Sequence, residues 1–383
     1  SAIPPDCLVR STIRSLLYVG RDIAFIVSFG IAIRAVDYHL SPLQPRYSPG
    51  DIAITIVRWI AWLTYFWFQG LAFTGLWILG HEAGHGSLSP SRILCDTIGY
   101  TIHSSLGSPY YSWRFSHKQH HDFNGHMDRD QHFIPKTRSS PSSAPERLSA
   151  VEMFIESVED TPIYQVLSLV VRQLIGFQLY LLFNLSGQPE YPSWTSHFNP
   201  NSIMFRPDQF WDIILSDVGV VCAILMTCSF AHKFGWGMVT RMYIVPWLLM
   251  SHWISMIVFL QHRDPYIPHY RQGEWTYVRG TLATMDRPFL GWQGKLFLHY
   301  ISHCHVVHHL YSTIPFYHAE RATEAIKPIL GNHYNHCDTS AFQALWNNYR
   351  GCQYVDSTGD ILFFRDKRGN SKRAPFGVVK AWI

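Results

Sequence analysis

Three histidine boxes, at residues 81–85, 117–121 and 305–309, are the part of the chain most suited to chemistry. Histidines three or four positions apart lie on one face of a helix, so each box can direct several imidazoles to one point. Imidazole binds iron, zinc, copper and nickel well. Eight imidazoles exceed what one ion coordinates, so the boxes predict a site for two ions. Their histidines are His81, His85, His117, His120, His121, His305, His308 and His309.

Two rival functions start from the same residues. The first box reads His-Glu-x-x-His, the zinc-protease motif in which Glu82 would act as general base. That interpretation leaves the other two boxes unexplained. Histidines inside membrane spans would instead suit a metal transporter. The boxes fall at span ends or in polar sequence, which favours a metal site on one face of a membrane.

The composition indicates a membrane protein with a polar cap. The 383 residues are 47% hydrophobic and 15% aromatic, only 15% are charged, and the mean hydropathy is −0.01. A net charge of +4, scattered along the chain, gives no sign of nucleic-acid binding. The seven cysteines lack the paired spacing of zinc or redox motifs, which favours a reducing compartment.

Apolar runs predict an all-α integral membrane protein, a single domain over residues 1–383 with four transmembrane helices. The predicted spans are residues 22–40, 52–80, 212–231 and 240–261, and a helical cap comprises residues 81–185 and 262–383. If the boxes share one metal site, an even number of crossings must separate His121 from His305. The apolar run at residues 163–185 contains Arg172, Gln173 and Gln178, which are costly at mid-bilayer, so we expect it to lie in the interface or the cap.

Motifs beyond the boxes give the chain a family resemblance. Together with the boxes, they resemble the membrane fatty acid desaturases, and among these the delta-12 (oleate) desaturase type of plants and fungi. The motifs cover nearly the whole chain. They are Ala2-Ile3-Pro4-Pro5, Arg10-Ser11, Tyr18-Val19-Gly20-Arg21-Asp22, Trp113-Arg114-Phe115-Ser116, Asp128-Arg129-Asp130, Phe183-Asn184-Leu185-Ser186-Gly187, Leu260-Gln261-His262, Asp286-Arg287 and Ser312-Thr313-Ile314-Pro315-Phe316-Tyr317.

The resemblance implies a cytosolic cap that holds a histidine-rich di-iron centre, with dioxygen as co-substrate. It carries the ligand role to the eight box histidines and adds His262 as the ninth. Removing hydrogen from an unactivated methylene requires an oxidising power that metal centres obtain from dioxygen. The implied activity is the introduction of a double bond, at the delta-12 position, into a mono-unsaturated acyl chain such as oleoyl.

The same scaffold has alternative outcomes. An acetylenase, hydroxylase, epoxidase or conjugase, in a specialised lipid or secondary-metabolite pathway, is the runner-up, because small shifts in substrate pose change the outcome. Ala83 and Gln119 depart from the oleate desaturase pattern, as does Arg263 after His262. Acyl-CoA and phospholipid-linked substrates both remain open.

Each turnover needs two electrons from outside. The chain contains no haem-binding His-Pro-Gly-Gly signature and no dinucleotide-binding glycine fingerprint. The resemblance implies cytochrome b5 and NADH-cytochrome b5 reductase as electron donors, and a multi-pass location in the endoplasmic reticulum membrane with the active site facing the cytosol. Lys118, Arg263 and Arg271 are candidate docking residues for an acidic donor.

Other polar residues have weaker claims. Glu82, Asp122, Asp128 and Asp130 are candidates for orienting ligand imidazoles, and Asp286-Arg287 favours a structural ion pair over a headgroup contact. The remaining thirteen histidines are expected to be surface or hydrogen-bonded groups, with a role beside the ligands weighed for His303. They are His39, His103, His126, His132, His197, His232, His252, His269, His299, His303, His318, His333 and His336.

Overall fold

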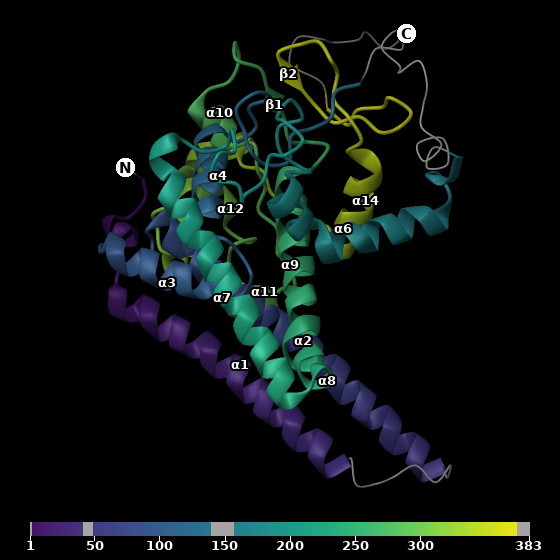
Figure 1. Cartoon of the computed structure of the whole chain (residues 1–383). Coiled ribbons are helices and arrows are strands. Elements are labelled where there is room, and N and C mark those ends of the chain that lie inside the picture. Colours follow the sequence, from purple (N-terminus) through teal and green to yellow (C-terminus); the bar gives the residue numbers. More distant parts are fainter. Residues whose placement is uncertain (1, 41–48, 139–156, 374–383) are drawn as a thin grey trace.

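The computed structural model describes residues 2–40, 49–138 and 157–373, and their regular structure is almost entirely helical. Two β-strands, β1 (His269–Tyr270) and β2 (Ile361–Leu362), form a small antiparallel pair. Within the predicted cap, residues 139–156 and 374–383 lie outside the described residues. Long helices extend from one side of a group of short helices and loops (Figure 1).

The long helices are apolar enough to enter a bilayer. Among the described residues, five helical stretches have the length and hydropathy of membrane spans, and several expose large apolar side chains. This confirms a mainly helical protein of membrane type, although the number of spans predicted from sequence was four. The stretches contain α1 (Thr12–Leu40), α2 (Pro49–His85), α6 (Pro162–Phe183), α7 (Phe210–Phe234), and α8 (Trp236–Val239) with α9 (Val245–His262).

Local sequence sets the limits and bends of these helices. Helix α6 begins where the Thr161 hydroxyl accepts a hydrogen bond from the Tyr164 N–H, and it ends at Asn184 in the left-handed conformation. Helices α8 and α9 are joined by a π-helical turn, Thr240–Ile244. Pro246 follows this turn and has no N–H to offer the Met242 carbonyl, which instead accepts a bond from the Tyr65 hydroxyl.

Short helices make up the part of the molecule that holds the histidines. After α2 come α3 (Arg92–Ser105) and α4 (Tyr110–Phe123), and α3 begins where the Ser91 hydroxyl accepts a bond from the Leu94 N–H. The second half adds five more short helices. They are α10 (Tyr277–Thr281), α11 (Trp292–Phe297), α12 (His305–Leu310), α13 (Phe316–Leu330) and α14 (Ala341–Gly351).

Glycines in α2 permit close packing just before the first box. A Cβ at Gly75 would lie 2.2 Å from the Phe297 carbonyl oxygen, and one at Gly80 would lie 2.3 Å from the His103 ring. His103 stacks on Trp77, with ring centroids 4.9 Å apart, and its Nε2 lies 3.0 Å from the Trp77 carbonyl oxygen. Helix α3 is thereby fixed against the end of α2, immediately before His81.

Candidate metal centre

Four elements deliver the nine predicted ligands to one place. The last turn of α2 carries His81 and His85, α4 carries the second box, α12 carries the third, and His262 is the last residue of α9. Eight of the nine are buried and His85 is half-buried. Residues more than 200 positions apart therefore meet in a single cluster.

The ring nitrogens form two groups. In the first, His81, His85, His117 and His308 each offer a ligand atom within 4.8 Å of the others. His121 extends this group, because its Nε2 is 3.1 Å from His117 Nε2. Within the group, the His81 and His308 Nε2 atoms are 3.0 Å apart.

The second group contains His120, His262 and His309, whose ligand atoms also lie within 4.8 Å of one another. His305 extends it, since its Nε2 is 3.1 Å from His262 Nε2 and 3.2 Å from His309 Nε2. The His121 and His309 rings stack with centroids 4.1 Å apart and join the two groups. The nine histidines thus divide into five around one point and four around another.

This donor set fits two metal ions. Two imidazole nitrogens, each about 2.0–2.1 Å from one ion, lie roughly 3 Å apart when they occupy neighbouring coordination positions. The Nε2 pairs at 3.0–3.2 Å have this spacing. Burial lowers the pKa of His117, His121, His305 and His309 well below the usual value, and lowers that of His308 to about 3. Neutral imidazoles keep the lone pair that a metal requires.

Of the four acidic residues considered as orienting groups, two contact ligands. Asp130 Oδ1 accepts a hydrogen bond from His120 Nδ1 at 2.7 Å, which leaves Nε2 free for a metal. Glu82 Oε1 lies 3.6 Å from His308 Nδ1, and Ser87 donates to the other carboxylate oxygen. Asp122 pairs with Lys118 at the surface and Asp128 is exposed, so both are ordinary surface charges.

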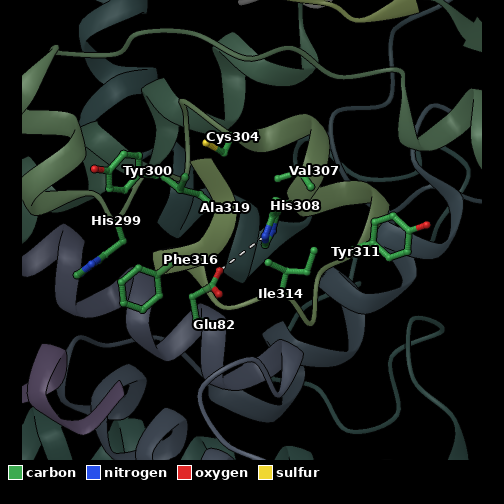
Figure 2. Close-up of a pocket in the computed structure, with 11 residues that line it drawn as sticks. Glu82, His299, Tyr300, Cys304, Val307, His308, Tyr311, Ile314, Phe316 and Ala319 are labelled. Carbon is green, nitrogen blue, oxygen red and sulfur yellow. Dashed lines mark ion pairs between the residues drawn. The ribbon is translucent and has the colours of Figure 1, made fainter. Parts of the chain in front are cut away.

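A small cavity lies behind Glu82 and His308. Its volume is about 10 Å³, enough for one water-sized molecule. Figure 2 shows the Glu82 carboxylate directed at the His308 ring, with His299, Phe316 and Ala319 on the walls around them. A zinc protease would require Glu82 to act as a general base. Its contact with His308, a histidine of the third box, does not support that role.

Buried hydrogen bonds fix the third box against the end of α9. Asp286 Oδ1 accepts a bond from the Val306 N–H at the start of α12, and Asp286 Oδ2 accepts one from Tyr334. Arg287 donates to the Leu260 carbonyl and to Asp264. The ion pair expected between Asp286 and Arg287 is wrong, because each side chain binds other partners, and both have structural roles through those partners.

Two histidines outside the ligand set differ from the expectation drawn from the sequence. His132, expected to be an ordinary hydrogen-bonded group, stacks on His120 with ring centroids 4.7 Å apart. His132 lies outside the helical spacing of the second box, so the sequence pattern did not point to it. His303 adjoins the third box, yet its ring contact is with Tyr300 and none of the described ring contacts or hydrogen bonds joins it to the nine histidines. The role weighed for His303 therefore lacks structural support.

The fold and site define a mainly helical protein of membrane type with a histidine-rich centre suited to two metals. The fatty acid desaturase family model matches residues 58–341, about three quarters of the chain. The chain belongs to the fatty acid desaturase family, and it is therefore an oxidoreductase.

Three curated relatives illustrate the similarity. A delta(12) fatty acid desaturase of Mortierella isabellina is 40% identical over 95% of this chain and 88% of that protein. An oleate hydroxylase of Claviceps purpurea is also 40% identical, over 96% of this chain and 80% of that protein. An omega-6 fatty acid desaturase of Glycine max, named as an endoplasmic reticulum isozyme, is 38% identical over 96% of this chain and 89% of that protein.

Proposed function

We propose that this chain is an oxygen-dependent fatty acyl desaturase that introduces a delta-12 double bond into a mono-unsaturated acyl chain such as oleoyl. The observation that carries the proposal is the convergence of nine imidazoles, eight of them buried, from four distant elements on two adjacent points. The similarity to delta(12) desaturases, which covers most of this chain and most of each relative, supports the delta-12 position of the double bond.

We propose iron for both metal positions. His81, His85, His117, His121 and His308 would hold one ion, and His120, His262, His305 and His309 the other. Bound iron supplies the capacity to use dioxygen for removing hydrogen from an unactivated methylene pair. The overall reaction consumes one dioxygen, two electrons and two protons per double bond and releases two waters. The protein's own contribution is burial, which keeps the imidazoles neutral, and the fixed ring orientations at Asp130 and Glu82.

Four membrane spans agree best with a single metal centre. The helical stretches between the second and third boxes are α6, α7, and α8 with α9. Three crossings would put the boxes on opposite sides of the bilayer, so one stretch must not cross. Helix α6 runs across the direction of the other long helices (Figure 1), and it contains Arg172 and Gln173, which favours an interfacial position for it.

We propose that the cap faces the cytosol at the endoplasmic reticulum membrane. The named location of the soybean relative supports the compartment. Cytochrome b5, reduced by NADH-cytochrome b5 reductase, is the proposed electron donor. Of the three docking residues considered from sequence, Lys118 is exposed but paired with Asp122, whereas Arg263 donates to the Cys352 carbonyl and Arg271 to the Gly359 carbonyl. Each of the three side chains therefore has a partner within the protein, and the docking surface for the donor stays a prediction.

Hydroxylation of the same acyl chain is the second candidate. It is favoured by one observation, the 40% identity to an oleate hydroxylase, which equals the identity to the delta(12) desaturase. Desaturation and hydroxylation begin with removal of the same class of hydrogen and differ in the step that follows. Acetylenase and conjugase activities belong to the same group of outcomes.

The activity is tested by expression in a yeast that lacks delta-12 desaturation, followed by gas chromatography with mass spectrometry of total fatty acids. We expect a new diene derived from oleate, because the acyl pool of such a yeast supplies the substrate and its cytochrome b5 supplies electrons. A hydroxy acid or an alkyne in its place would support the alternative. An unchanged fatty acid profile, with the protein present in the membrane fraction, would contradict the proposed substrate.

A further inference from the structure

His132 differs from the other histidines outside the proposed ligand set. Its side chain is only 7% exposed, and its ring is nearly parallel to that of His120, with an interplanar angle of 13° and centroids 4.7 Å apart. Its Nε2 is buried and has no hydrogen-bond partner among the described residues. Buried ring nitrogens without a partner also occur at His103, His197 and His303, so the near-parallel contact with a proposed ligand is what distinguishes His132 among the described residues.

One carboxylate links His132 to the ligand it stacks on. Asp130 Oδ1 accepts hydrogen bonds from His120 Nδ1, at 2.7 Å, and from the backbone N–H of His132, at 3.0 Å. Asp130 Oδ2 accepts from the Gly125 N–H at 2.9 Å. The carboxylate therefore fixes one edge of the His120 ring and, at the same time, the backbone of the residue that covers its face.

The other neighbours of His132 hold it in place. Tyr180, on α6, meets the His132 ring edge-on with centroids 4.8 Å apart. His262 and His309 also approach His120, but nearly at right angles, as ligands converging on one ion would. His132 gives His120 its closest near-parallel ring contact among the described residues.

We propose that His132 is a positioning residue for the second metal, holding His120 in its ligand orientation by stacking on it. This inference rests on the proposed function, because it assumes an ion at the His120 group. An imidazole bound through Nε2 can still tilt about the metal–nitrogen bond unless its edge and its face are both held. Asp130 holds the edge and His132 holds the face. His121 and His305 each place Nε2 3.1 Å from the Nε2 of another proposed ligand, whereas His132 Nε2 has no nitrogen or oxygen partner among the described residues, so its role is to position rather than to bind.

The test compares His132→Ala and His132→Phe in the full-length protein purified in detergent. Iron per chain is measured before and after dialysis against a chelator, together with the melting temperature of the metal-free protein. In His132→Ala we expect the affinity for one of the two ions to fall about 10- to 100-fold, so that iron declines from two per chain toward one. His132→Phe keeps a flat ring and should retain both ions.

His126→Ala is the matched control. His126 lies in the same segment and is also buried, but its ring bonds to Gln272 and has no ring contact with the nine histidines among the described residues. This variant should lose stability and keep two irons. If His132→Ala fails to reach the membrane, His132→Leu, which fills the volume without a flat ring, replaces it.

Selective loss of one ion in the Ala or Leu variant, with rescue by Phe, would support the role. Full retention of both ions in the Ala or Leu variant would overturn it, as would a Phe variant that loses iron to the same extent. Wild-type protein that binds no iron would contradict the proposed function itself, and it would leave His132 with no ion to position.

Discussion

His308→Ala is expected to abolish turnover while the protein still inserts into the membrane. The His308 ring lies in the first ligand group, with Nε2 3.0 Å from His81 Nε2 and Nδ1 3.6 Å from Glu82 Oε1. Its removal takes away one of five proposed ligands to that ion and the partner of a buried carboxylate. Because changes outside the ligand set already cost about 10- to 100-fold, loss of a ligand should lower product formation by more than about 100-fold.

The measurement is the amount of new fatty acid per unit of membrane-bound protein in the yeast assay. His303→Ala is the control, because His303 is a neighbouring histidine of the same segment without a described contact to the nine imidazoles. The control should keep its turnover. If His308→Ala retained a substantial fraction of wild-type product, the assignment of His308 as a ligand would be wrong.

Among the substitutions considered, Arg287→Leu should lower the stability of the folded protein most. Arg287 and Asp264 are 3% and 4% exposed, and their side chains form an ion pair at 2.5 Å. Without Arg287, a buried carboxylate and the Leu260 carbonyl both lose a charged donor. Breaking a buried pair on one side typically costs about 3–5 kcal/mol. We expect the melting temperature in detergent to fall by on the order of 5–10 °C.

Two further variants separate the buried pair from ordinary surface charge. Arg206→Leu breaks an exposed pair with Asp208 and should leave the melting temperature unchanged. Adding Asp264→Asn to Arg287→Leu removes the stranded charge and should recover part of the stability. An Arg287→Leu protein as stable as wild type would show that this pair does not hold α9 to the third box.

Periodicity explains why most of the ligand set is visible in the sequence. His81 and His85, one helical turn apart, and the two His-x-x-His-His boxes each mark one face of a helix, and the structure brings those faces together. His262 has no such spacing, because it is a single residue at the end of α9. Only the resemblance to desaturases suggested it, and the structure places its Nε2 3.1 Å from His305 Nε2.

Contacts between distant segments could not be derived from spacing. Nothing local distinguishes Asp130, which binds a ligand histidine, from Asp128, which faces solvent, since the difference depends on the turn after α4. The stacking of His132 on His120 depends on the same turn. The adjacency of Asp286 and Arg287 in the sequence suggests an ion pair between them, yet Arg287 binds Asp264, which follows the end of α9.

The number of membrane spans could not be predicted from hydropathy and length alone. Hydropathy and length alone qualify α6 as a membrane helix, as they do the other long helices. Its one charged residue, Arg172, its glutamines, and the requirement that the boxes meet favour the proposed interfacial position. Whether α6 crosses the membrane therefore depends on where the three boxes meet in space. That information is absent from the local sequence of the helix.

Metal analysis of the purified full-length protein, by inductively coupled plasma mass spectrometry, tests the central claim most directly. We expect about two iron atoms per chain, falling in variants of either ligand group. A single ion per chain, or zinc in place of iron at both positions, would contradict a di-iron centre built from the nine histidines.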